Sequence, residues 1–262
     1  MPTIQTLISA MHQTDHSLLD KMNIQTDAVV VNQCDRDEIE RFTYKGHQIL
    51  WLSLKERGVG LSRNTALMRA TADIVLFADE DVCYEDAYDQ KILQEFARHP
   101  TTDFMVFSIT RVAKGKTTQV RRITHPSRRL HWFNVLRYGT VCFAVKRESL
   151  VKANLYFHLL FGGGTPHGSG EDSIFITHAL RHGLEVRSSQ VNIAQVLDEH
   201  STWFKGYTEK YWFDKGVLFE YLFGKWAYPL GLVLLLKNRF QTKDLGLKNS
   251  FKNMLRGIKH GL

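Results

Sequence analysis

From residue 72 to residue 82 the chain reads Ala72-Asp73-Ile74-Val75-Leu76-Phe77-Ala78-Asp79-Glu80-Asp81-Val82. The unbroken apolar run is typical of a strand buried on both faces of a parallel sheet, and it ends abruptly in three carboxylates. Open α/β sheets bind their ligands at the edge where such strands end. The stretch therefore predicts an α/β fold with acidic groups at its binding edge.

The three acids suggest a metal site. Side chains alternate along an extended segment, so Asp79 and Asp81 are expected to point to one side and Glu80 to the other. Two carboxylates on one side suit a hard divalent cation, Mg²⁺ or Mn²⁺, which usually keeps positions for water and substrate phosphate. The alternative is a solvated acidic turn that closes the strand, and three acids alone do not decide between the two.

Three other segments predict neighbouring strands. Residues 27–33 form a continuous β-branched run, and residues 3–10 and 47–53 also have strand patterns. Because strands alternate with helical segments at this spacing, we predict a doubly wound, mostly parallel sheet. The residues that close two of these strands are candidates for the binding edge: Ser9, Ala10, Asn32, Gln33 and Asp35.

Residues 57–64, RGVGLSRN, form a glycine loop that runs into a helix. Ser62 is the expected N-cap, and a flexible loop ahead of a helix N-terminus is a ready anion site. With Gly60 in the loop and Arg63 and Asn64 in the first turn, the segment is suited to a diphosphate and a base. The spacing matches neither of the common glycine-rich phosphate loops, so a plain surface loop is the alternative.

A second glycine-rich segment, residues 161–170, leads straight into Glu171 and Asp172 at the start of a helix. A mobile loop followed by paired acids is an attractive place for a general base. Acids in a first helical turn are also favoured by the helix dipole alone. Further on, His200 would be a metal ligand if its strand end converges on the three acids, although a lone histidine more often is not.

Composition and net charge limit the kinds of binding partner that the protein can have. The 262 residues carry a formal net charge of +7 and a pI of about 9.3, which favours nucleotide phosphates, nucleic acid or an anionic membrane face. The three cysteines are widely spaced, which predicts reduced thiols in a cytoplasmic protein. The first residues lack the pattern of a signal peptide, and no stretch reaches the length of a membrane span.

The C-terminal region is aromatic and then basic. Residues 204–223 carry aromatic side chains at helical spacing, which are expected to pack against the sheet or to stack on an acceptor. Toward the end, one apolar stripe runs along a cationic helix: Leu247, Phe251, Met254, Leu255, Ile258 and Leu262. Such a helix typically lies in an anionic membrane interface, and the alternative is a terminal helix docked on its own domain.

Together these motifs resemble the family 2 glycosyltransferases of the GT-A fold, in the form found in bacterial polysaccharide synthesis. The resemblance covers roughly residues 3–202 and is strongest over residues 57–82, where a glycine–Arg-Asn helix, a strand and a DXD motif follow one another. The pair Glu171-Asp172 is similar to the family's late acidic pair, whose Asp commonly serves as base. His200 matches a position at which some members place a third metal ligand.

The resemblance implies a mixed, mostly parallel sheet flanked by helices, and transfer of a sugar from a nucleotide diphosphate sugar with inversion. It implies a UDP-sugar donor and Mn²⁺ or Mg²⁺ held by Asp81, with Asp79 beside it. Asp172 would be the base, with Glu171 the next choice. The acceptor would be a glycan or a lipid-linked oligosaccharide, and no nucleic acid partner is expected.

At the residues expected to bind the donor, the match to the family pattern is incomplete. The second strand of family members usually ends in an acidic pair before a Gly-Ser turn, whereas residues 32–36 here read NQCDR. The uracil contact therefore stays open between Gln33 and Asp35. The remaining residues assigned to the donor are Ser9, Ala10, Gly60, Arg63, Asn64, Asp79 and Glu80, the last of these pointing away from the other acids.

We expect a GT-A domain over residues 1–203, divided near residue 112 into a nucleotide-sugar half and an acceptor half. A helical, basic extension over residues 204–262 would place the enzyme peripherally on the inner face of the plasma membrane. Three alternatives remain: a nucleotidyltransferase, a retaining GT-A enzyme and a non-catalytic basic membrane-binding module. The first would need a glycine-rich, Arg-containing loop after the first strand, which residues 9–13 do not supply.

Overall fold

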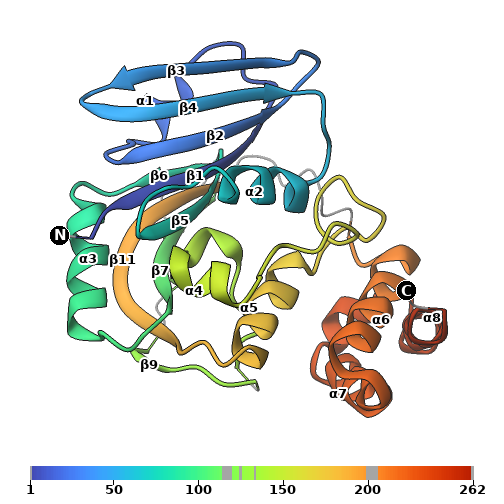
Figure 1. Cartoon of the computed structure of the whole chain (residues 1–262). Helices are drawn as coiled ribbons and strands as arrows, with labels where there is room; N and C mark the ends of the chain where they lie inside the picture. The colour runs from blue at the N-terminus through green and yellow to red at the C-terminus, as the bar shows by residue number, and fades with distance from the viewer. Residues whose placement is uncertain (1, 114–119, 124–125, 133, 199–205, 261–262) are drawn as a thin grey trace.

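The structure is a computed structural model that describes residues 2–113, 120–123, 126–132, 134–198 and 206–260 (Figure 1). Within these residues, eleven strands form one mixed sheet, with a central order of β3-β4-β2-β1-β5-β10-β7-β11-β6. The strands are β1 (Ile4–Met11), β2 (Asp27–Gln33), β3 (Glu38–Tyr44), β4 (His47–Leu54), β5 (Ile74–Asp79), β6 (Val82–Tyr84), β7 (Phe104–Ala113), β8 (Val120–Ile123), β9 (Arg128–Arg129), β10 (Phe143–Lys146) and β11 (Val186–Asp198).

The centre of the sheet is the predicted parallel unit. Strands β4, β2, β1 and β5 run parallel, and β7 and β11 form a second parallel pair. Within β5, Val75, Leu76 and Phe77 are fully buried, as the apolar run predicts. In the register of β1 and β5, Ser9 lies opposite Asp79, so the strand ends meet at one edge.

Helices cover this sheet and extend it on one side. Helix α2 (Val59–Leu67) packs on β1 and β2, α3 (Tyr88–Arg98) on β11, and α4 (Arg147–Lys152) on β10. In Figure 1, α2, α4 and α5 (Glu171–Arg181) lie in front of the sheet. The remaining helical elements are α1 (Leu18–Lys21), η1 (Thr140–Cys142), α6 (Glu209–Phe223), η2 (Gly224–Trp226), α7 (Ala227–Lys237), η3 (Arg239–Thr242) and α8 (Leu247–Lys259).

Two local patterns misled the prediction from sequence. Strand β3 was not expected, because it is an edge strand that pairs with β4 and is rich in charged residues. The apolar residues of segment 127–136 recur at helical spacing and predict a helix, but the described residues of this segment form β9 and turns. Its apolar residues Leu130 and Val135 are buried by contacts with distant parts of the chain instead of by one helix face.

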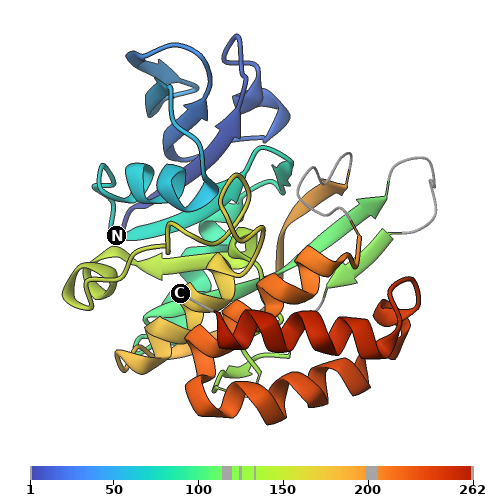
Figure 2. The ribbon, with the colours of Figure 1, turned by 90° about the vertical axis from the view of Figure 1, so that its right-hand side faces the viewer.

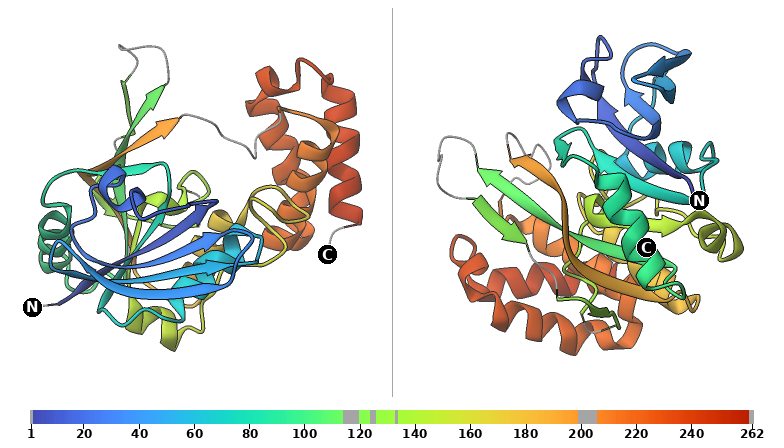
Figure 3. Two further views of the ribbon diagram at one scale, coloured as in Figure 1. Left: turned by 90° about the horizontal axis from the view of Figure 1, so that it is seen from above. Right: turned by 90° about the vertical axis from the view of Figure 1, so that its left-hand side faces the viewer.

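Helices α6, α7 and α8 form a C-terminal bundle to one side of the sheet (Figures 2 and 3). Met254 and Ile258 of α8 are buried in it together with Trp212, which lies on α6. Phe251 and Leu255 are partly buried against the same cluster, so most of the stripe packs on the protein's own bundle, as the docking alternative predicted. Leu247 is 41% exposed, and Leu262 lies outside the described residues. Among the described residues, no helix is long and apolar enough to cross a membrane.

Candidate active site

Arg63 joins the two acidic motifs. Its Nη2 donates to both carboxylate oxygens of Asp79, at 2.8 and 3.0 Å, and its Nη1 donates to Oε1 of Glu171 at 3.0 Å. Helix α2 thus connects the end of β5 to the start of α5. Residues that lie 92 positions apart in the chain share one guanidinium, which is the bidentate geometry that arginine offers and lysine does not.

The guanidinium is held in a largely apolar setting. Arg63 is 4% exposed, and its Cζ lies 5.3 Å from the centre of the Phe157 ring. Burial alone would lower the pKa of Arg63, but Asp79 and Glu171 raise the pKa above its ordinary value. Phe157 in turn stacks on Phe175 of α5 with 4.0 Å between ring centres. The contact between Phe157 and Arg63 could not be predicted from the sequence.

The start of α2 differs from the prediction. The helix begins at Val59 with Gly58 as its N-cap, so Ser62 is a buried residue within the helix and caps nothing. The N–H of Gly58 donates to Oε1 of Gln33, and the N–H of Val59 donates to the carbonyl of Gly163. Two of the N–H groups that were expected to face an anion are thus occupied by the protein itself.

Gly60 and Asn64 contribute to packing at this place. A Cβ on Gly60 would lie 2.7 Å from the carbonyl oxygen of His158, so only glycine allows this close approach. The side chain of Asn64 forms paired hydrogen bonds with the backbone of Phe157, at 2.9 and 2.8 Å. Both residues thereby hold the segment that carries the Phe157 ring beneath Arg63.

The ends of β1 and β2 place the remaining donor candidates. Gln33 is buried beside Ser9, whose hydroxyl is 3.5 Å from Nε2 of Gln33. Ala10 is also buried, whereas Asp35 is exposed. Because Gln33 is engaged with Gly58 and Ser9, Asp35 is the freer of the two side chains considered for a base contact.

Glu80 ties the acidic turn to the neighbouring strand. Its Oε2 accepts hydrogen bonds from the N–H of Met11 and from Nε2 of Gln13, at 3.0 and 2.8 Å. The carboxylate therefore points toward the end of β1. Strand β5 ends at Asp79, and Glu80 and Asp81 form a turn, so the strand alternation assumed in the prediction does not extend to them.

Asp81 fits a cation ligand. Burial raises the pKa of Asp81 to about 6, with Asp79 and then Glu80 adding to the effect. Among the described residues, none donates a side-chain hydrogen bond to this carboxylate, and none completes a set of three His, Cys, Asp or Glu ligands. A carboxylate offers about four acceptor sites, so Asp79 can hold Arg63 and still face a cation bound at Asp81. Water and donor phosphates would then supply the other ligands.

One oxygen of Asp172, Oδ2, accepts no hydrogen bond from the residues that the structure describes. Its Oδ1 accepts the N–H of Ser173 at 2.7 Å, and a Cβ on Gly139 would lie 3.7 Å from its Oδ2. Burial and the charge of Glu171 raise the pKa of Asp172 to about 6, while Arg63 and Lys215 act in the opposite direction. This carboxyl group is thus set to titrate close to neutral pH, as a general base requires.

Helix α6 reaches this site from the C-terminal bundle. Asp214 accepts hydrogen bonds from Nδ1 of His167 and the N–H of Gly168, at 3.0 and 3.2 Å, and so holds the second glycine-rich segment. The next residue, Lys215, interacts electrostatically with Asp172, Glu171 and Asp214, while burial lowers its pKa. Neither residue was found from the sequence, because no motif precedes them.

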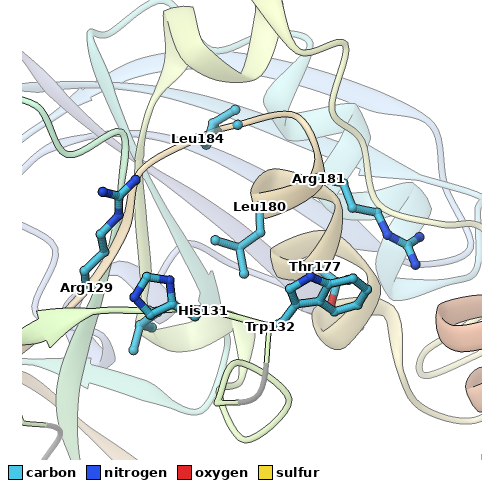
Figure 4. A pocket seen from close by; sticks show the side chains of 9 residues that line it. Arg129, His131, Trp132, Thr177, Leu180, Arg181 and Leu184 are labelled. Atoms are coloured by element: carbon cyan, nitrogen blue, oxygen red, sulfur yellow. The ribbon is translucent and has the colours of Figure 1, made fainter.

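Two features lie apart from this cluster. His200, the third proposed metal ligand, falls outside the described residues. A cavity of about 230 Å³ lies at the far end of α5, away from Glu171 and Asp172 (Figure 4). It is lined by Arg129, Leu130, His131, Trp132, Thr177, Leu180, Arg181, Gly183 and Leu184.

Comparison with solved structures places the fold in a known class. The chain is similar to TarS of S. aureus, residues 1–349, with 13% identity and a TM-score of 0.58, over 83% of this chain and 64% of that one. For TarS in complex with UDP-GlcNAc the values are 15%, 0.62, 95% and 75%, and with UDP they are 14%, 0.59, 86% and 68%. The chain thus spans less than two thirds of the first of these. The architecture is that of the GT-A glycosyltransferases.

The family follows from the sequence model. A model described as glycosyl transferase family 2 matches residues 1–154, which is more than half of the chain. The chain belongs to this family. No curated protein matches it significantly.

Proposed function

We propose that this enzyme transfers a sugar from a UDP-sugar to a glycan or lipid-linked acceptor, with inversion, in the synthesis of a cell-surface polysaccharide. The observation that carries the proposal is the double contact of Arg63 with Asp79 and Glu171. It joins a donor-side acid to the pair that contains the base. TarS, which has the same fold, is known in complex with UDP and UDP-GlcNAc, and this supports the choice of donor.

In this proposal Asp172 removes the proton of the acceptor hydroxyl. The acceptor oxygen then forms a bond to the anomeric carbon as the bond to the diphosphate breaks, and the electron pair leaves with the diphosphate. Oδ2 of Asp172 receives the proton, while Arg63 and Lys215 favour the ionised base before transfer. The segment 161–170, held by Asp214, would exclude water from the donor.

The proposal includes a divalent cation, Mn²⁺ or Mg²⁺, held by Asp81 with Asp79 beside it. When bound, such a cation neutralises the charge that develops on the departing diphosphate. Asp81→Asn should abolish the Mn²⁺-dependent part of UDP affinity measured by calorimetry. Asp86→Asn is the matched control, because it makes the same change at an exposed acid outside the acidic turn while keeping an acceptor for Asn23. Equal UDP affinity with and without Mn²⁺ in the unaltered protein would remove the metal from the proposal.

The donor can be tested without knowing the acceptor. We expect UDP-sugars, in a panel of nucleotide sugars with Mn²⁺, to raise the melting temperature and to be hydrolysed slowly. Stabilisation by another nucleotide alone would contradict the UDP assignment. NMR of the anomeric centre of a transfer product would then distinguish inversion from retention.

We further propose that the enzyme works in the cytoplasm, peripherally on the inner face of the plasma membrane. The concentration of basic residues in the C-terminal bundle supports this location, since anionic lipids attract them. The apolar stripe of α8 does not, because most of it is buried within the bundle. The membrane contact must therefore lie elsewhere on the protein.

A further inference from the structure

Helix α7 exposes an apolar face. Its residues Ala227, Gly231 and Leu235 recur every four positions and are buried against the bundle. The outer side is nevertheless apolar as well, and a helix that is apolar all round is normally enclosed by a core or by a membrane. The exposed residues, here called the α7 patch, are Trp226, Tyr228, Leu232, Val233 and Leu236, which are 71%, 43%, 44%, 48% and 51% exposed.

The α7 patch follows the helix geometry of a single surface. Tyr228, Leu232 and Leu236 are spaced by four residues, so they lie one above another on the outer side, and Val233 adjoins them. Trp226 stands directly before the first turn. In Figure 2 this helix lies along the lower edge of the bundle, away from the sheet. The patch is therefore not covered by the described part of the chain.

Positive charge lies at both ends of the patch. The exposed residues Lys225, Lys237 and Arg239 flank α7 at its two ends. Residues 204–262 contain 11 Lys and Arg against four Asp and Glu, while residues 1–203 contain 23 of each. The whole net charge of +7 thus belongs to the C-terminal segment that carries the patch.

The exposed apolar side chains and the basic residues together favour one kind of binding partner. A second copy of the chain would bring one strongly basic surface against another, which is unfavourable. An anionic lipid surface suits both features, because headgroups attract the lysines while the acyl boundary takes Leu and Val side chains. Trp and Tyr are enriched at this depth of a bilayer. We propose that α7 lies in the interface of an anionic membrane and, with its flanking basic residues, anchors the enzyme there. The proposal rests on the peripheral location given above and is independent of the donor.

Sedimentation with lipid vesicles tests this surface. At 0.1 M salt, we expect the full chain to bind vesicles of 70% phosphatidylcholine and 30% phosphatidylglycerol, and to leave vesicles of pure phosphatidylcholine unbound. Val233→Glu with Leu236→Glu should weaken binding roughly tenfold or more, because each change removes apolar burial and adds repulsion. Ile39→Glu with Val151→Glu makes the same kind of change at residues 59% and 61% exposed, far from α7, and should bind as the unaltered protein does.

The outcomes separate the alternatives. An unaltered chain that stays in the supernatant with anionic vesicles would overturn the proposal, and so would an α7 variant that binds normally. A concentration-dependent dimer in light scattering, lost in the α7 variant, would assign the patch to a second copy. Both variants should keep the unaltered thermal shift with UDP and Mn²⁺. If no protein shows that shift, the donor proposal fails, while the vesicle result still stands.

Discussion

Asp172 is the residue whose ionisation controls the proposed reaction. Its pKa of about 6 means that the carboxylate form is half populated near that pH. We expect the transfer rate to rise with pH up to about 6 and then to level off, because only the ionised base accepts a proton.

Asp172→Asn should keep donor affinity and lower transfer by roughly 10² or more, the scale of lost general-base catalysis. Steady-state kinetics over pH 5–8 measure both effects. Near-normal turnover of Asp172→Asn would assign the role of the base to Glu171 instead.

The same carboxyl group affects stability with a definite sign. The pKa in the folded protein lies above the ordinary value of 3.8, so the folded state holds the proton more tightly than the unfolded state. The contribution of Asp172 to stability is thus present below pH 4 and is lost as pH rises to about 6. Asp172→Asn should therefore raise the melting temperature above pH 6 and change it little below pH 4. A uniform shift across this range would argue against the raised pKa.

Arg63 has a structural effect beyond the donor site. Arg63→Met would leave Asp79 and Glu171 facing each other without a cation. Losing one partner of a buried pair typically costs about 3–5 kcal/mol of unfolding free energy, and we expect the low end because Asp79 is 34% exposed. Arg63→Lys should recover part of the stability, since an ammonium group cannot span both carboxylates. Urea unfolding of the two variants compares these losses, and equal stability of all three proteins would contradict the role of the pair.

At the level of helices, α6 and α8 meet through glycines. A Cβ on Gly216 would lie 2.1 Å from the carbonyl oxygen of Met254, so the two backbones touch. Gly216→Ala should lower the unfolding free energy by about 1–3 kcal/mol, the usual effect of overpacking. Gly231→Ala is the matched control: its nearest neighbour is the flexible end of Met254, and alanine favours helix by about 1 kcal/mol. In thermal melts, Gly216→Ala should therefore have a lower melting temperature than Gly231→Ala. Equal melting temperatures would mean that α6 and α8 can move apart without loss of stability.

At the scale of the whole molecule, the C-terminal bundle packs on α5 and on the second glycine-rich segment. One apolar cluster joins Phe161 of the glycine-rich segment, Ile174 of α5, and Val217, Leu218 and Leu222 of α6. A chain ending at residue 203 would expose that cluster and would lose the Asp214 contacts with His167 and Gly168. We expect this truncation to lower the melting temperature and to open residues 161–170 to proteolysis. A truncated chain as resistant as the full one would support two independent domains, divided as the sequence suggests.

Much of this protein is determined by local pattern. The apolar run of residues 74–78, its terminal acids and the alternation with helices were sufficient to predict the central strands, because a strand buried on both faces must be continuously apolar. The order of the Arg-Asn helix, the DXD strand and the late acidic pair also identified the family. Edge strand β3 escaped this reasoning, because an edge strand can be charged and needs only one neighbour.

The convergence of the site was decided by the tertiary structure. No spacing in the sequence shows that Arg63 binds Asp79 and Glu171 together, or that Phe157 supports its guanidinium. Nor does the stripe on the last helix reveal whether it meets lipid or protein, since both bury the same residues. In the fold, α6 and α7 cover most of that stripe, and the outer face of α7 is exposed instead. Which apolar face is buried depends on how helices that are distant in the chain pack together. The residue pattern of a single helix cannot predict that packing.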